Sequence, residues 1–186
     1  MVDVGVAGDE LFLSHRSYGF LEQVQQAVEE GRRQPRDRVR RLLAYYATAM
    51  RAVWRTPLAP IGVEVDGALA ADQAVLVTVA NVETYGDFLS LTPTASPIDG
   101  RLDVFVIPRT SKLGLAWRLL RIKLRLPGRW KGVSVFRGRE VVVVSEAGRD
   151  VLRVAQRVLP LVLPPGAIER LKQRQLEDEV PLETVA

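Results

Sequence analysis

Few residues of this sequence have the types and spacing that chemistry requires. The stretch TPTASPIDGRLDVFVI, residues 92–107, places the carboxylate of Asp99 directly before Gly100, in a turn that leads into an apolar strand. Pro97 fixes its own φ, and an Asp-Gly pair favours a tight turn, so backbone chemistry alone accounts for this pattern. The turn is the first candidate site, and a purely structural role is the alternative to it.

Catalytic and metal-binding residue types are otherwise scarce. The chain has one histidine, His15, and no cysteine, which excludes disulfides and thiolate metal sites and makes a zinc site improbable. A Ser-His-Asp triad would depend on His15, but a lone histidine is more often a surface or packing residue. Neither G-x-x-x-x-G-K-[ST] nor G-x-G-x-x-G occurs, so no glycine-rich phosphate loop is expected.

Positive charge is concentrated in one segment of the chain. Residues 109–139 contain ten Lys or Arg and no Asp or Glu. Because the whole chain has 26 basic and 22 acidic residues, 16 basic and 22 acidic remain elsewhere, a balance of −6. A local excess of this kind indicates a partner with negative charge.

The centre of this segment has the pattern of a basic amphipathic helix over residues 111–126. Apolar residues line one face and basic residues another; they are Leu113, Trp117, Leu120 and Leu124, and Arg118, Arg121, Lys123 and Arg125. One interpretation is docking on an anionic membrane, and another is a helix that packs on the sheet with solvated arginines. Nucleic acid, with Trp130 and Phe136 nearby, is a third and weaker interpretation.

The elements around these candidates predict an α+β fold. Helical spacing occurs over residues 20–31 and again over 39–53, which predicts two N-terminal helices. After Pro60 the period changes to that of strands, ahead of a last short helix over 164–178. Helices early and strands later predict a mostly antiparallel, β-sandwich-like sheet.

Length and composition predict a single domain. The chain has 186 residues, and 47% of them are apolar, which is enough to build a core. We expect one domain over residues 1–176 and a flexible tail over 177–186. No run of about 18 apolar residues occurs and the N-terminus has no basic region, so a cytoplasmic protein is expected.

Several motifs, in order, resemble the C-terminal domain of the bacterial diacylglycerol kinase family, lipid kinases related to sphingosine kinases and NAD kinases. The segment around residues 2–20 resembles the entry to that domain, and residues 38–54 its long helix. The most specific part is VANVETYGDFLSLTPTASPIDGRLDVFVI, residues 79–107. The family-motif residues are Gly19, Phe20, Asn81, Tyr85, Gly86, Pro93, Gly100 and Asp103.

The resemblance implies a role for the Asp99 turn. The turn resembles one that forms a structural magnesium site in the family, where the ligands are the aspartate carboxylate and two main-chain carbonyls. Carried over to this sequence, the ligands are Asp99 and the carbonyls of Ser96 and Arg101. Oxygen ligands of this kind suit Mg²⁺, which keeps several waters beside one carboxylate.

Departures from the family pattern argue against a kinase in this chain alone. The Gly-Gly-Asp-Gly-Thr loop of the family's nucleotide-binding domain is absent, and Ala155-Gln156-Arg157 stands where the family has a catalytic Asp-Gly-Glu. Phosphoryl transfer needs a phosphate cradle, a metal and a residue that orients the hydroxyl. We therefore expect a lipid-kinase-like module without an ATP site, non-catalytic alone, that binds lipid or an anionic membrane peripherally at its inner face.

Two other partners remain open. A separate ATP-binding chain could complete a split diacylglycerol or lipid kinase in trans, although the missing Asp-Gly-Glu argues against this alternative. An uncovered docking face would also favour self-association of the chain.

Overall fold

The computed structural model describes residues 1–20, 22, 54, 57–83, 91–92, 94–124, 126, 128 and 131–160. The two predicted N-terminal helices lie outside these residues except at positions 20, 22 and 54. The predicted C-terminal helix and tail, and Tyr85, Gly86, Pro93, Arg125 and Trp130, also lie outside them.

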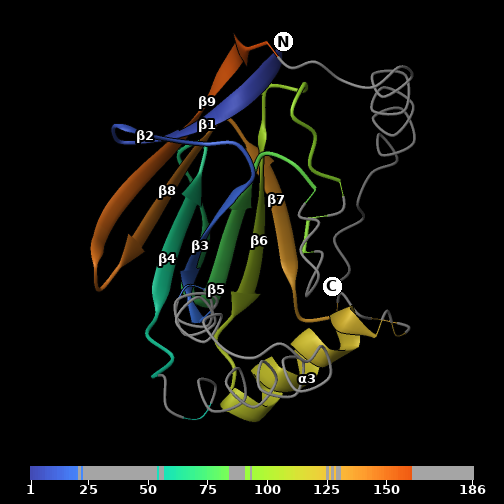
Figure 1. Ribbon diagram of the computed structural model, residues 1–186. Coiled ribbons are helices and arrows are strands. Elements are labelled where there is room, and N and C mark those ends of the chain that lie inside the picture. The colour runs from blue at the N-terminus through green and yellow to red at the C-terminus, as the bar shows by residue number, and fades with distance from the viewer. Residues whose placement is uncertain are drawn as a thin grey trace, which may run out of the picture.

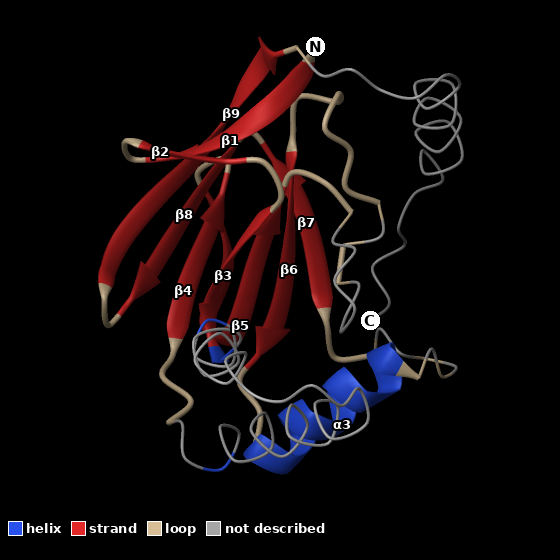
Figure 2. Ribbon diagram, viewed as in Figure 1, coloured by secondary structure: helices blue, strands red, loops and turns tan. Residues whose placement is uncertain are grey.

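The described chain is a set of antiparallel strands with one helix (Figures 1 and 2). The elements in chain order are β1 (Val2–Ala7), β2 (Glu10–Phe12), β3 (His15–Gly19), β4 (Ile61–Val65), β5 (Ala68–Ala80), β6 (Leu102–Pro108), α3 (Lys112–Lys123), β7 (Ser134–Gly138), β8 (Glu140–Ser145) and β9 (Gly148–Leu159). The strand order is β2-β1-β9-β8-β4-β5-β6-β7, and β3 pairs with β5. The prediction of a mostly antiparallel sheet is confirmed.

The long strand β5 makes the sheet sandwich-like, because its two halves have different partners. Its first half pairs with β4, from Val65 opposite Ala68 to Ile61 opposite Ala74. Its second half pairs with β3 on one side and β6 on the other. The strand therefore joins a layer of β2, β1, β9, β8 and β4 to a layer of β3, β6 and β7.

Two apolar cores lie on the two faces of the second layer. The first core combines side chains of both layers, such as Leu152 and Val143 from one and Val79 and Val104 from the other. The second core packs α3 against the sheet; its buried members are Phe20, Val75, Leu76, Leu91, Phe105, Ile107, Leu115 and Ile122. Alternation along β6 explains this division, since successive strand residues point to opposite faces.

The two ends of the sandwich carry different features. Figure 1 shows α3 across one end of the strands and the N-terminus at the other. The strands thus hold the basic helix well apart from the first residues of β1.

Candidate functional site

The Asp99 turn is bound into the fold through Gly100. The Asp99 Oδ1 atom accepts the main-chain N–H of Arg101 at 3.0 Å, which closes the turn. Gly100 has a φ of 69°, and a Cβ at this position would overlap the side-chain amide of Gln156. The backbone conformation therefore favours glycine, and any larger residue would also have to displace the Gln156 side chain.

A buried aspartate, Asp3 of β1, binds this turn from the other side. Its Oδ2 atom accepts the Gly100 N–H at 2.7 Å, and its Oδ1 atom accepts the Arg157 N–H at 2.9 Å. The N–H of Asp3 donates to the carbonyl of Pro97 at 2.7 Å. One carboxylate thus joins β1, the turn and β9, and we call Asp3, Asn81, Asp99, Gly100 and Arg157 the Asp3 cluster.

Sequence reasoning missed Asp3. The signal for it was present, since an acidic residue stands alone in the strand sequence VDVGVA. A buried carboxylate in such a strand requires hydrogen-bond donors, and only the fold brings Gly100 and Arg157 to it.

The motif residue Asn81 belongs to the same cluster as a structural link. Its Nδ2 atom donates to the carbonyl of Asp3 at 2.8 Å and to that of Leu13 at 3.3 Å. Its main-chain N–H donates to the carbonyl of Ser14 at 2.8 Å. Asn81 therefore holds β1 and the β2–β3 connection at the end of β5.

The motif residue Asp103 anchors the segment that precedes the turn. Its buried Oδ1 atom accepts from Arg137 Nε at 3.1 Å and from Thr94 Oγ1 at 3.2 Å. Arg137 also donates to the carbonyl of Thr94 at 3.2 Å. These contacts fix residues 94–97 against β6 and β7, so the position of Asp99 is set from both sides.

The electrostatics at Asp99 are compatible with a cation. Burial raises the pKa of its carboxyl above the usual value, and the nearby charges of Asp103 and Asp3 add to this shift. The Arg101 N–H and the positive charge of Arg137 oppose this rise in the pKa. Negative charge here is therefore only partly compensated. No group of three His, Cys, Asp or Glu suited to a metal occurs in the described part of the chain, so a cation would depend on main-chain carbonyls such as those of Ser96 and Arg101.

Residues Ala155, Gln156 and Arg157 form an irregularity in β9 opposite β1. The pairing shifts between Val2 opposite Leu159 and Val4 opposite Ala155, and Arg157 has a φ of 54°, unusual for a residue with a side chain. The stretch lies beside the Asp99 turn, because the Gln156 side chain packs over Gly100. These three residues supply no carboxylate to the cluster.

At the other end of the sandwich, α3 begins at its predicted position. Ser111 is the N-cap, and its hydroxyl accepts the N–H of Gly114 at 3.1 Å. The helix buries Leu115 and Ile122 in the second core. Because these residues are not the ones predicted to form its apolar face, α3 has apolar side chains in two directions, and the prediction of a simple amphipathic helix is not supported.

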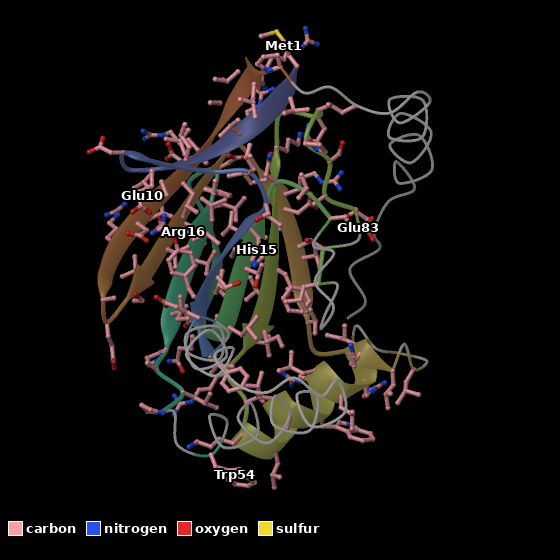
Figure 3. All side chains as sticks on the ribbon, in the orientation of Figure 1. Met1, Glu10, His15, Arg16, Trp54 and Glu83 are labelled. Atoms are coloured by element: carbon pink, nitrogen blue, oxygen red, sulfur yellow. The ribbon has the colours of Figure 1, made fainter. Side chains whose placement is uncertain are left out.

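The predicted apolar face is exposed. Leu113, Trp117, Leu120 and Leu124 have exposed fractions of 68%, 56%, 45% and 57%. They recur at steps of four, three and four residues and so form one stripe along the helix, which we call the α3 stripe. Trp54, also exposed, lies at the same end of the molecule (Figure 3), where Lys112 Nζ donates to its carbonyl at 2.6 Å.

Two of the predicted basic residues of α3 contact the chain on either side of the helix. Arg121 Nη2 donates to the carbonyl of Gly128 at 2.6 Å, and Arg118 Nη1 reaches the carbonyl of Pro108 at 3.5 Å. The Arg118 guanidinium also lies against Gly132. Arg118, Arg121 and Lys123 are therefore all at the surface of α3, but Arg118 and Arg121 have structural contacts as well.

The motif pair Gly19-Phe20 ends β3 and is structural. Gly19 has a φ of 75°, and a Cβ there would lie 2.8 Å from the carbonyl oxygen of Val75. Phe20 is buried in the second core. None of the described helices is both long and apolar enough to cross a membrane.

Comparison with known families identifies this architecture. The sequence model of the YegS C-terminal NAD kinase beta sandwich-like domain matches residues 16–156. The chain belongs to this family. A search of curated proteins found no match to the YegS-type domain described here.

Solved structures of Bacillus anthracis str. Sterne proteins have the same fold as this YegS-type domain. One described as a diacylglycerol kinase aligns with a TM-score of 0.58 and 20% identity over 89% of this chain. Another, described as a proposed diacylglycerol kinase, aligns with a TM-score of 0.58 and 23% identity over 83% of this chain. In both cases this chain spans 54% of the other's length.

Proposed function

We propose that this YegS-type domain is a lipid-kinase-like module that binds lipid at an anionic membrane surface through α3, and that it is non-catalytic alone. The observation that supports this proposal best is the α3 stripe. A helix that already buries Leu115 and Ile122 leaves four further large apolar residues in solvent. The proposal implies a peripheral location at the cytoplasmic face of a membrane.

The composition of α3 suits an anionic interface. Trp and Leu side chains enter the boundary between headgroups and acyl chains. Each Lys or Arg near an anionic surface adds about 1 kcal/mol, and Arg118, Arg121 and Lys123 lie on the same helix. Because Arg118 and Arg121 also bond to main-chain carbonyls outside the helix, the apolar stripe is the better target for substitution.

A non-catalytic role is supported by what surrounds the Asp3 cluster. The described stretch of β9 beside the Asp99 turn carries Gln156 and Arg157 rather than an acidic residue. The sequence contains no Gly-Gly-Asp-Gly-Thr loop. A kinase needs both a cradle for the transferred phosphate and a residue that orients the acceptor hydroxyl.

Co-sedimentation with vesicles tests the membrane proposal. We expect wild-type protein to pellet with vesicles of phosphatidylglycerol, less so at moderate salt, and not with phosphatidylcholine. Trp117→Ser and Leu120→Ser should each weaken pelleting about fivefold to tenfold, since each removes an inserted side chain. The matched control is Leu69→Ser, which removes an apolar residue of β5 that is 70% exposed.

The outcomes separate three occupants of the stripe. Equal pelleting of Trp117→Ser and Leu69→Ser contradicts docking through α3. A wild-type dimer in sedimentation equilibrium that Trp117→Ser converts to monomer assigns the stripe to a second copy of the chain. Binding to duplex DNA or RNA at an affinity equal to that for vesicles supports nucleic acid instead.

The alternative is that this chain forms a diacylglycerol or lipid kinase together with a separate ATP-binding chain. It is supported by the length comparison, because this chain spans about half of the solved structures that share its fold. Phosphorylation of diacylglycerol only after mixing with a nucleotide-binding partner would establish it. Activity of the purified chain alone would contradict both this alternative and the non-catalytic proposal.

We also propose that Asp99 helps to hold a structural Mg²⁺, together with the carbonyls of Ser96 and Arg101. Support comes from the partly compensated charge at Asp99. Added Mg²⁺ should raise the melting temperature of the wild type and leave that of Asp99→Asn unchanged. An equal rise in both proteins contradicts the site.

A further inference from the structure

A pocket of about 390 Å³ lies away from both α3 and the Asp3 cluster. It forms where β1 ends, because β1 pairs with β9 only as far as Ala7 opposite Leu152. Arg149, Asp150 and Val151 of β9 extend past that point. The lining residues are Val6, Ala7, Gly8, Glu10, Arg16, Arg149, Asp150, Val151 and Arg153.

Three arginines reach this pocket from two strands. Arg16 comes from β3, and Arg149 and Arg153 come from β9. Figure 3 shows Arg16 and Glu10 next to each other beside β9. Arg149 and Arg153 lie two residues before and after Val151 on the strand, so the three side chains point to the same face of the sheet. The apolar side chain of Val151 therefore lies between the two arginines.

The carboxylates at the pocket already have partners. Glu10 Oε2 lies 2.7 Å from Arg16 Nη1. Asp150 Oδ2 accepts from the Tyr18 hydroxyl at 3.0 Å, and burial together with Asp150 raises the pKa of Tyr18, which keeps this donor protonated. Neither carboxylate forms an ion pair with Arg149 in the described part of the chain.

Guanidinium donors remain available on the β9 side of the pocket. Arg149 is exposed and forms no ion pair within the described residues. Arg153 shares only its Nε with Glu140, which leaves its Nη donors for another acceptor. Glu10, Asp150 and Glu140 match the three arginines in number. The pocket nonetheless offers the guanidinium of Arg149 and the Nη groups of Arg153 as donors.

We propose that this pocket binds the phosphate group of a small phosphate monoester with a short apolar body. A phosphate monoester carries nearly two negative charges and three terminal oxygens, so it can engage more than one guanidinium fork. A carboxylate has one charge and two oxygens and matches the three arginines less well. Val6, Ala7 and Val151 provide the apolar contact, and the volume suits a compact ligand.

Calorimetric titration of the full chain tests this site with three probes. We expect butyl phosphate to bind more tightly than inorganic phosphate, which lacks the apolar body, and butanol, which lacks the charge, not to bind. Arg149→Gln should weaken butyl phosphate about tenfold, the loss of charge-assisted hydrogen bonds. Arg109→Gln, which removes an exposed arginine at the far end of β6, is the matched control.

Two results overturn the proposal. One is equal affinity of butyl phosphate for wild type and Arg149→Gln, and the other is equal weakening by Arg149→Gln and Arg109→Gln. Because Arg149 is exposed, its substitution should leave the unfolding curve unchanged, which is checked by circular dichroism. Competition by phosphatidic acid in micelles assigns the phosphate to a lipid headgroup, and its absence assigns it to a soluble ester.

Discussion

The Asp3 cluster and the α3 stripe differ in burial and in their relation to the family motifs. In the cluster, the motif residues Asn81 and Gly100 are buried, and both donate hydrogen bonds to Asp3. In α3, Trp117 and Leu120 belong to no motif and face solvent. The family-motif residues thus maintain the fold, while the docking surface that we propose is visible in the sequence only as a helical spacing.

The strongest test of this contrast is the removal of the central carboxylate. Asp3→Ala should lower the free energy of unfolding by about 3–5 kcal/mol, because two buried N–H groups lose a charged acceptor. Asp9→Ala, an exposed residue of the following turn, should change it by less than about 0.5 kcal/mol. Urea unfolding measures both, and similar values would place the cluster outside the stabilising part of the fold.

Within α3, a pair of substitutions separates its packed side from its exposed side. Leu115→Ala should cost about 3 kcal/mol, since Leu115 is fully buried in the second core. Trp117→Ala should cost less than about 0.5 kcal/mol, because the stripe is exposed. A large cost for Trp117→Ala in urea would show that the stripe is covered in the folded chain.

Alanine substitutions at two glycines test whether the Gln156 side chain packs on the Asp99 turn. Gly8→Ala should cost about 1 kcal/mol from its φ of 59° alone, since nothing lies within 4 Å of the new Cβ. Gly100→Ala should cost about 1 kcal/mol more, because Gln156 must move. Adding Gln156→Ala should recover this extra cost in the double variant, and an unchanged cost would show that Gln156 does not pack on the turn.

The smallest expected effect is a pH dependence from His15 in β3. Burial lowers the pKa of His15 below 6.5, so the unfolded state binds the proton more tightly than the folded state. This contribution to stability is present above pH 6.5 and is lost as the pH falls toward the folded pKa. Urea midpoints at pH 7.5 and 5.5 should differ less for His15→Gln than for the wild type, and equal differences contradict the shift.

The sequence predicted individual strands better than their arrangement. The alternation in IGVEV matches β4 residue for residue, since every second residue is buried. The sequence DGALAAD, residues 66–72, is typical of a turn region, but only Asp66 and Gly67 turn, and Ala68–Ala80 is one continuous strand. Residues 150–154 and 157–163 read as two strands, but β9 runs through Gly148–Leu159 with an irregularity opposite Asp3. Local sequence patterns do not show whether a strand continues past a bulge.

Sites were predictable only where a single segment carries them. The Asp99 turn and the α3 stripe are each local in sequence. Asp3 meets Gly100 and Arg157 across 97 and 154 positions, and the arginine pocket combines β3 with β9. Such sites follow from strand order, which no short spacing encodes.

The pairing of β1 with β9 has a consequence for how the protein is made. Val2 pairs with Leu159, so the edge of β1 that does not pair with β2 stays uncovered until almost the whole described chain has been made. At ribosomal speeds of about 5–20 residues per second, this delay is on the order of 10–30 s. During that time an apolar strand with unpaired backbone groups is exposed to other nascent chains, and the solubility of newly made protein should depend on the chaperones that shield it.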